Sequence, residues 1–133
     1  MTINYRGIEI PTTARDWQLF TNKKASKAAK ELTAALKTAF LTFSFNARQE
    51  EDVEEALVSA GRVLAPVMKR YENLGAYDTE ARGLAVTALM NYAKLTMYGI
   101  APEYTYSAVP TGSRWDEETF KLWDAAQKGM TTR

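Results

Sequence analysis

The sequence predicts a mainly α protein, a four-helix bundle-like domain with a small N-terminal β-hairpin. Residues 78–99 have the composition of a helix that is apolar over most of its circumference, and such a helix must be covered on several sides. The stretches before and after it repeat apolar residues at the i, i+3, i+4 spacing of amphipathic helices. Residues 2–10 instead favour strand by composition. We therefore expect the third of four helices to be the central one.

The predicted central helix has clear ends. Asp78 is a suitable N-cap, and Gly99 lies where a left-handed residue would end the helix. Its polar positions form one narrow row at helical spacing, which we expect to be its solvent edge. The row consists of Glu80, Gly83, Thr87, Asn91 and Lys94.

Residues 1–21 are predicted to hold the hairpin, with residues 3–10 and 16–20 as its two parts. The alternative is a short helix capped by Thr13, because Thr13 and Asp16 have capping-box spacing. A hairpin is marginal by itself, so we expect it to pack on the helices.

Two helices are predicted between the hairpin and the central helix. The first covers residues 26–43, and its end at residues 41–45 is rich in β-forming residues and is expected to fray. Asn46 is expected to cap the second helix, which continues to Gly75. Pro66 interrupts the second helix, but the apolar stripe keeps its phase across it. We therefore predict one helix kinked at Pro66 rather than two helices.

The C-terminal part is predicted to be a connector over residues 100–112 and a helix over residues 113–130. Ser113 is the expected N-cap of this helix, and Gly129 is its expected stop. With residues 22–99 as a three-helix core, the 133 residues are expected to form a single domain.

Composition excludes several classes of chemistry. The chain has no cysteine and no histidine, so disulfides, thiolate nucleophiles, His-containing triads and most zinc sites are ruled out. We find no GxSxG, GxxxxGK[ST] or GxGxxG motif and expect no enzyme activity and no cofactor. No signal-peptide pattern or membrane-length apolar run is present, so a cytoplasmic protein is expected, in the host cytoplasm if it is viral.

Charge is balanced overall but uneven along the chain. The 17 basic and 16 acidic residues give a net charge of +1, yet basic residues dominate the first third. On the first helix they would form a lysine face, and such a face can track phosphates. This face is the basis of an alternative hypothesis of nucleic-acid binding. Its residues are Arg15, Lys23, Lys24, Lys27, Lys30 and Lys37.

Aromatic residues of the connector and last helix are candidates for contact with a protein partner. We expect Tyr104, Tyr106 and Trp115 to bind a partner, because tyrosine and tryptophan are favoured at interface hot spots. Phe120 and Trp123 are expected to cover the central helix instead.

The acidic residues near the start of the second helix have a structural explanation. Carboxylates in the first turn of a helix are stabilised by the helix dipole, so we expect no metal site there. The cluster consists of Glu50, Glu51, Asp52, Glu54 and Glu55.

The hypothesis drawn from the sequence is a non-enzymatic protein–protein interaction module, meaning an adaptor, a stoichiometric inhibitor or an assembly subunit, with homo-oligomerisation as one mode of contact. Small phage-encoded proteins have a comparable make-up.

Overall fold

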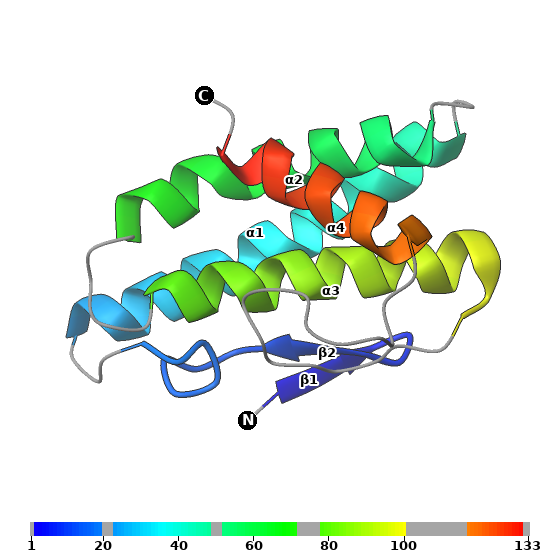
Figure 1. The fold of residues 1–133 in the computed structure, drawn as a ribbon. Helices are drawn as coiled ribbons and strands as arrows, with labels where there is room; N and C mark the ends of the chain where they lie inside the picture. Colours follow the sequence, from blue (N-terminus) through cyan, green and yellow to red (C-terminus); the bar gives the residue numbers. More distant parts are fainter. Residues whose placement is uncertain (1, 20–22, 49–51, 72–77, 101–116, 132–133) are drawn as a thin grey trace.

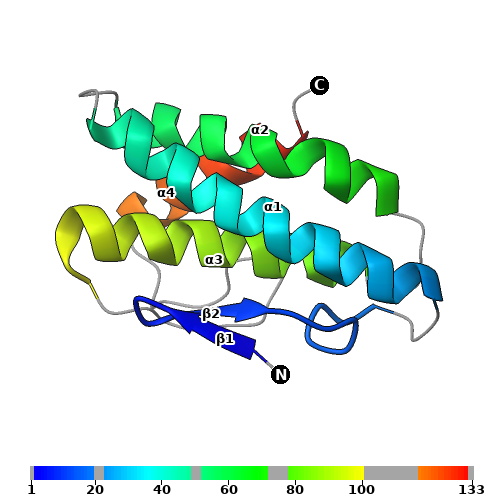
Figure 2. The same ribbon diagram turned by 180° about the vertical axis from the view of Figure 1, so that it is seen from behind.

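The computed structural model describes residues 2–19, 23–48, 52–71, 78–100 and 117–131. It confirms a mainly α fold with four helices and an N-terminal two-stranded sheet. The elements are β1 (Thr2–Tyr5), β2 (Ile8–Pro11), α1 (Lys23–Arg48), α2 (Val53–Tyr71), α3 (Asp78–Tyr98) and α4 (Glu117–Thr131). Figures 1 and 2 show α2 and α4 on one side of the molecule and the hairpin on the other, with α1 and α3 between them.

Helix α3 is the centre of the bundle, as predicted. It packs against the three other helices and against β2. From Ala81 to Ala93 every residue is buried except Arg82, which is partly buried. The helix ends at Gly99, which has a φ of 67° and donates its N–H to the Leu95 carbonyl at 3.0 Å. This bond defines an αL C-cap.

The polar row on α3 is not a solvent edge, so that prediction is wrong. Thr87 is buried, and Asn91 is only 1% exposed. Lys94 is partly buried and donates from Nζ to Thr119 Oγ1 of α4 at 3.1 Å. Helix α4 packs against α3 and reaches this row at Lys94.

The hairpin is present, with a short turn. Tyr5 pairs with Ile8, and the connecting residues Arg6 and Gly7 have φ values of 54° and 88°. Positive φ at both central positions is typical of the type I′ turn, whose twist matches that of paired strands. The side chain of Asn4 supports the turn by accepting the Gly7 N–H on Oδ1 at 2.8 Å.

The prediction that residues 16–20 belong to the hairpin is wrong. Both strands lie within residues 2–11, and the segment that follows forms one helical turn. Thr13 begins this turn, because its Oγ1 accepts the Asp16 N–H at 3.1 Å and its carbonyl accepts the Trp17 N–H at 2.9 Å. The bond from Asp16 N–H to Thr13 is the one that the capping-box spacing indicated, but the segment forms a single turn and not the short helix of that alternative.

Helix α1 is longer than predicted at its C-terminal end. It reaches Arg48, so residues 41–45 are helical and Asn46 lies inside α1 instead of capping α2. Contact with α3 overrides the β propensity of this stretch. Ser44 Oγ lies 2.6 Å from the hydroxyl of Tyr92 on α3, within hydrogen-bond distance.

Helices α2 and α4 also differ from expectation. Helix α2 continues through Pro66, which confirms one helix rather than two; a kink there stays a prediction. Helix α4 does not stop at Gly129 but continues to Thr131. Gly129 instead meets Gly61 of α2, and a Cβ atom on Gly129 would lie 3.0 Å from the Gly61 Cα. Gly129 therefore serves close helix packing.

Within the described residues, no helix combines the length and the apolar character that crossing a lipid bilayer requires.

Candidate docking surface on helix α1

The outward side of α1 carries exposed side chains of two kinds. Lysines occupy its N-terminal part, and two large apolar residues follow them toward the C-terminal end. Leu41 is 63% exposed and Phe45 is 64% exposed, the highest values among the large exposed hydrophobic residues that the structure describes. We define the α1 outer face as Lys23, Lys27, Lys30, Lys37, Leu41 and Phe45, all of them exposed.

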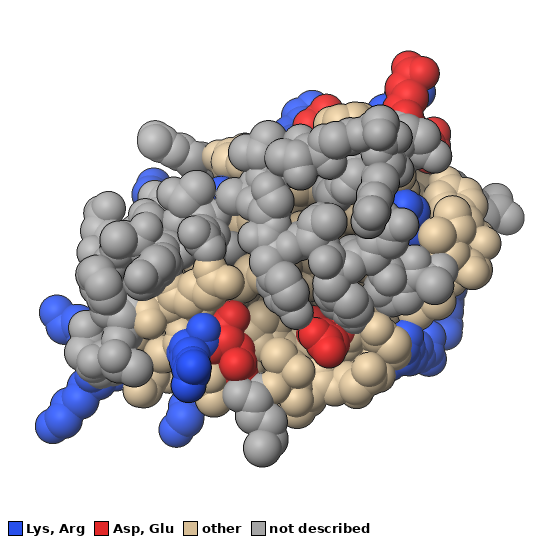
Figure 3. Space-filling view, turned by 60° about the horizontal axis from the view of Figure 1, so that its bottom comes forward, with Lys and Arg blue, Asp and Glu red and all other residues tan. Residues whose placement is uncertain are grey.

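Helix geometry places these residues on one side of α1. Lys23, Lys30 and Lys37 are seven residues apart, which is close to two full turns, and Lys37, Leu41 and Phe45 follow at spacings of four. The helix has 26 residues and is therefore about 39 Å long. In Figure 3, lysine and arginine side chains project at the left, at the end of the molecule where α1 begins.

The inward side of α1 explains why the outer face is free. It buries a stripe of small and large apolar residues against α2 and α3. The stripe already satisfies the packing of α1, so burial of Leu41 and Phe45 is not required by the fold. Its members are Ala25, Ala28, Ala29, Leu32, Ala35, Leu36, Ala39, Phe40 and Phe43.

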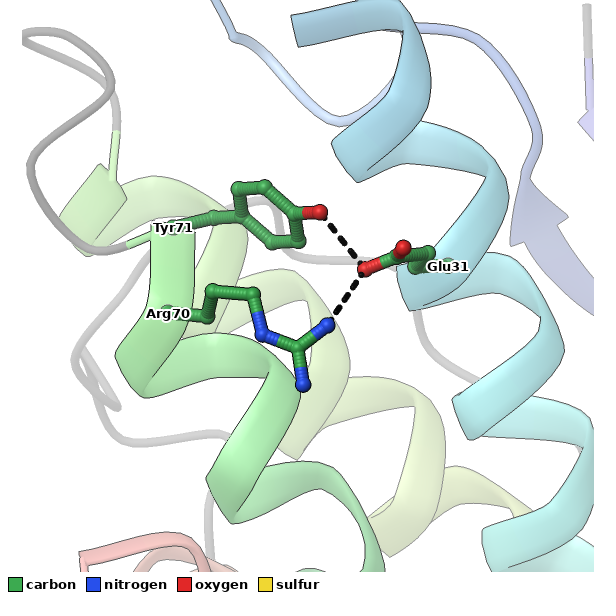
Figure 4. A network of polar contacts seen from close by, with 3 residues as sticks. All are labelled: Glu31, Arg70 and Tyr71. Atoms are coloured by element: carbon green, nitrogen blue, oxygen red, sulfur yellow. Dashed lines mark hydrogen bonds and ion pairs between the residues drawn. The ribbon is translucent and has the colours of Figure 1, made fainter. Parts of the chain in front are cut away.

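Glu31 is the one acidic residue of α1, and it is turned toward α2. Its Oε2 accepts a hydrogen bond from the Tyr71 hydroxyl at 2.6 Å and forms an ion pair with Arg70 Nη1 at 3.1 Å. Figure 4 shows both residues reaching from α2 toward the Glu31 carboxylate. The carboxylate is thus engaged between two helices and does not interrupt the lysine row.

The network perturbs the titration of Tyr71. The hydrogen bond to Glu31 raises the pKa of the Tyr71 phenol, and partial burial adds to the increase. A phenol whose pKa is raised in the folded state contributes stability that is present below its unfolded pKa and is lost as pH rises through the folded pKa.

We therefore expect Glu31→Gln to lower the pKa of Tyr71, because an amide oxygen accepts a weaker hydrogen bond from the phenol than a carboxylate does, and it carries no charge to oppose the phenolate. The measurement is the tyrosinate absorbance as a function of pH, recorded for each protein and for its Tyr71→Phe counterpart, so that the difference isolates Tyr71. An unchanged midpoint would contradict the contact. Lys37→Gln, an exposed change elsewhere on α1, is the matched control.

The other predicted basic residues are also at the surface. Arg15 is exposed on the helical turn before α1, and Lys24 is exposed beside the α1 outer face. All six residues of the predicted lysine face are therefore accessible. The predicted partner-binding residues Tyr104, Tyr106 and Trp115 lie outside the described residues. Trp123 packs against the core and Phe120 is 38% exposed, and contact of either residue with the central helix stays a prediction.

An acidic end adjoins the C-terminal end of α1. Asp52, Glu54 and Glu55 are exposed at the start of α2, where the helix dipole favours them. Burial raises the pKa of the nearby Tyr98 phenol, and the charges of Glu118, Asp52 and Glu54 raise it further. Glu50 and Glu51 lie outside the described residues. Over the part of the chain that the structure describes, no group of three or more side chains is placed to hold a metal ion.

A shallow depression of about 530 Å³ lies between α2 and α4. Three acidic and three basic side chains line it, so its charge favours neither anions nor cations. These side chains are Glu54, Glu55, Arg62, Lys121, Asp124 and Lys128.

Leu41 and Phe45 were not predicted as part of this surface, because residues 41–45 were expected to fray, whereas α1 continues to Arg48. Their spacing of four and their phase with the lysines would have placed them on the outer face of a longer helix. No protein family, curated protein or solved structure matches the chain.

Proposed function

We propose that this protein is a non-enzymatic protein–protein interaction module that docks through the α1 outer face. The observation that carries the proposal is the exposure of Leu41 and Phe45 one turn apart, directly after a row of lysines. Aromatic and aliphatic side chains that are exposed together in a polar surround are typical of protein contact sites. Adaptor, stoichiometric inhibitor and assembly subunit are the roles that fit this mode of action, and a phage origin and a cytoplasmic location belong to the same proposal.

The lysines favour a second candidate function, nucleic-acid binding. From Lys23 to Lys37 they span about 21 Å along one side of a helix, and each could neutralise a phosphate. Two features make it the weaker candidate. No aromatic residue stands among the lysines to stack on a base, and no arginine accompanies them within this span.

One set of variants separates the two functions. The first experiment captures partner proteins from a lysate of the natural host. The Leu41→Ser/Phe45→Ser variant is expected to capture at least tenfold less of the partner protein, because two central contacts disappear. Ala34→Ser, an exposed change on the same side of α1, is the control and should retain it. Both changes are on the surface, so thermal unfolding should be unaltered within about 0.5 kcal/mol.

The nucleic-acid arm uses a fluorescent 20-base-pair DNA duplex and an RNA of equal length. If the second function holds, binding falls steeply with salt and is abolished by Lys23→Glu/Lys27→Glu/Lys30→Glu, while Leu41→Ser/Phe45→Ser has little effect. That result would replace the proposed function. Loss of a protein partner in the serine variant, with weak or no binding of either nucleic acid, would support it.

A further inference from the structure

We propose that a pocket between the hairpin turn and the C-terminal ends of α1 and α3 binds a phosphate group, held by Arg6 and Arg48. The pocket has a volume of about 240 Å³. This is smaller than the cavities that enclose drug-sized ligands, so it suits a small ionic group. None of its described lining residues belongs to the α1 outer face, so the site goes beyond the proposed function.

Two guanidinium groups line the pocket from different parts of the fold. Arg6 belongs to the turn between β1 and β2, and Arg48 is the last residue of α1. Among the described residues, neither arginine forms an ion pair and no carboxylate lines the pocket. An arginine fork can donate two parallel N–H bonds to phosphate oxygens, and a phosphate monoester carries close to two negative charges at neutral pH. The charge of the ligand thus matches that of the pair.

The helix ends at the pocket do not cancel the two positive charges. Ala47 and Arg48 are in the last turn of α1, and Thr96 and Met97 are in the last turn of α3. Each helix C-terminus is equivalent to about half a negative charge, so the two ends together offset about half of the charge of the arginines. The nearby acidic residue Glu54 lines the depression between α2 and α4 instead. The pocket therefore keeps a positive charge.

A serine hydroxyl adds a hydrogen-bond donor. Ser44 lines the pocket, and its Oγ lies 2.6 Å from the Tyr92 hydroxyl, with either oxygen able to donate to the other. When Tyr92 donates, the Ser44 O–H is free to donate to a phosphate oxygen. The Thr96 hydroxyl already donates to the Tyr92 carbonyl at 2.8 Å. Ser44 is therefore the hydroxyl that can turn its proton toward a ligand.

The turn position of Arg6 is unusual for its residue type. Its φ is 54°, in a turn of the kind that favours asparagine and glycine. The side chain does not support the turn, since Asn4 accepts the Gly7 N–H. It lies instead over the ring of Tyr5, with 5.9 Å between the guanidinium carbon and the ring centroid. The Tyr5 ring in turn lies 6.0 Å from that of Tyr92, so the guanidinium group is held beside the pocket.

The test is a titration of the isotope-labelled full chain with sodium phosphate, followed through the backbone amide chemical shifts. At about pH 7.5 the dianion dominates, because its pKa is about 6. We expect the amides of Gly7, Ser44 and Thr96 to shift and to saturate with a dissociation constant of about 1 mM at constant ionic strength.

Two further anions define the ligand. Acetate carries one charge and should bind at least about fivefold more weakly than phosphate. Phenyl phosphate adds an apolar group that can contact Met97, which is 41% exposed at the pocket. Tighter binding of phenyl phosphate than of inorganic phosphate would support an ester as the ligand, and the reverse order would support the free ion.

The variant Arg6→Asn/Arg48→Gln should weaken phosphate binding at least about tenfold, because both charged donors are lost. Arg6→Asn creates the Asn-Gly pair that a type I′ turn prefers, so the hairpin is expected to persist. Arg15→Gln removes an exposed arginine from the helical turn before α1 and should leave the dissociation constant unchanged.

The inference is overturned if these amides do not shift, if the double variant binds phosphate as the wild type does, or if acetate binds as tightly. Shifts confined to the lysine row of α1 also overturn it, because phosphate would then be following the lysines. Capture of a partner through Leu41 and Phe45 is independent of all these outcomes, so the proposed function and this inference can fail separately.

Discussion

Gly129→Ala is expected to destabilise the bundle by about 3 kcal/mol or more, with a fall in Tm on the order of 10 °C. An added Cβ would collide with the carbonyl oxygen of Val58 and lie 2.9 Å from its carbonyl carbon and 3.0 Å from the Cα of Gly61. All three are backbone atoms, so relief requires that α2 and α4 move apart. The measurement is urea and thermal unfolding followed by circular dichroism.

Two other glycines make this prediction specific. Gly61→Ala should have a comparable effect, because its Cβ would lie 2.5 Å from the Ala126 carbonyl oxygen. Gly99→Ala meets no atom within 4 Å and should lose about 1 kcal/mol through its positive φ alone. If Gly129→Ala were no more harmful than Gly99→Ala, the close crossing of α2 and α4 would be disproved.

Trp17→Ala is expected to lower the free energy of unfolding by about 4 kcal/mol. The indole is 0% exposed, and its Nε1 donates to Thr33 Oγ1 of α1 at 3.0 Å. The Thr33 hydroxyl lies 2.7 Å from the carbonyl oxygens of both Pro11 and Ala29 and can donate to one of them at a time. Trp17 therefore fastens the N-terminal segment to α1.

Comparison variants separate ring burial from the hydrogen bond. Trp17→Phe keeps most of the buried ring and should lose less stability than Trp17→Ala. Arg15→Ala, on the exposed side of the same helical turn, should change stability by less than about 0.5 kcal/mol. Equal stability of the alanine and wild-type proteins in urea would refute the anchoring role.

The sequence predicted the central helix well because its signals agree at every level. Residues 78–99 combine an apolar circumference with a suitable residue at each end, and the structure places α3 there among the other helices. The stripe that begins at Ala25 likewise lies on the buried side of α1. An apolar stripe that repeats over several helical turns indicates the buried face of the helix, so a prediction based on it is reliable.

The errors arise where tertiary contacts decide between local alternatives. Trp17 and Leu19 alternate with Gln18 as in a strand. In the structure, however, Trp17 belongs to a turn that Thr13 caps, and its side chain is buried. Asn91 was expected at the surface because it is polar, yet it is buried, and the sequence does not show which elements pack around α3. Gly129 was read as a helix stop because glycine often ends helices. In the structure a glycine is needed there because α4 crosses α2 closely at this residue.

The candidate site was predicted in part. The lysine row was predicted from its spacing and lies at the surface. Its apolar continuation, Leu41 and Phe45, was not predicted. The β-forming composition of residues 41–45 outweighed their helical phase in the prediction. Contact of this stretch with α3, which includes Ser44 beside Tyr92, keeps it helical and brings Leu41 and Phe45 outward.

The meeting of Gly61 and Gly129 has a consequence for biosynthesis. Helix α4 is translated after the other three, so the ribosome must synthesise the chain beyond Gly129 before the α2 seat for this helix can be filled. Until then the strip of α2 around Val58 and Gly61 lacks the helix that packs on it. Among the four helices, α4 is thus the last to be seated, and stalled chains that lack it would expose that strip to chaperones.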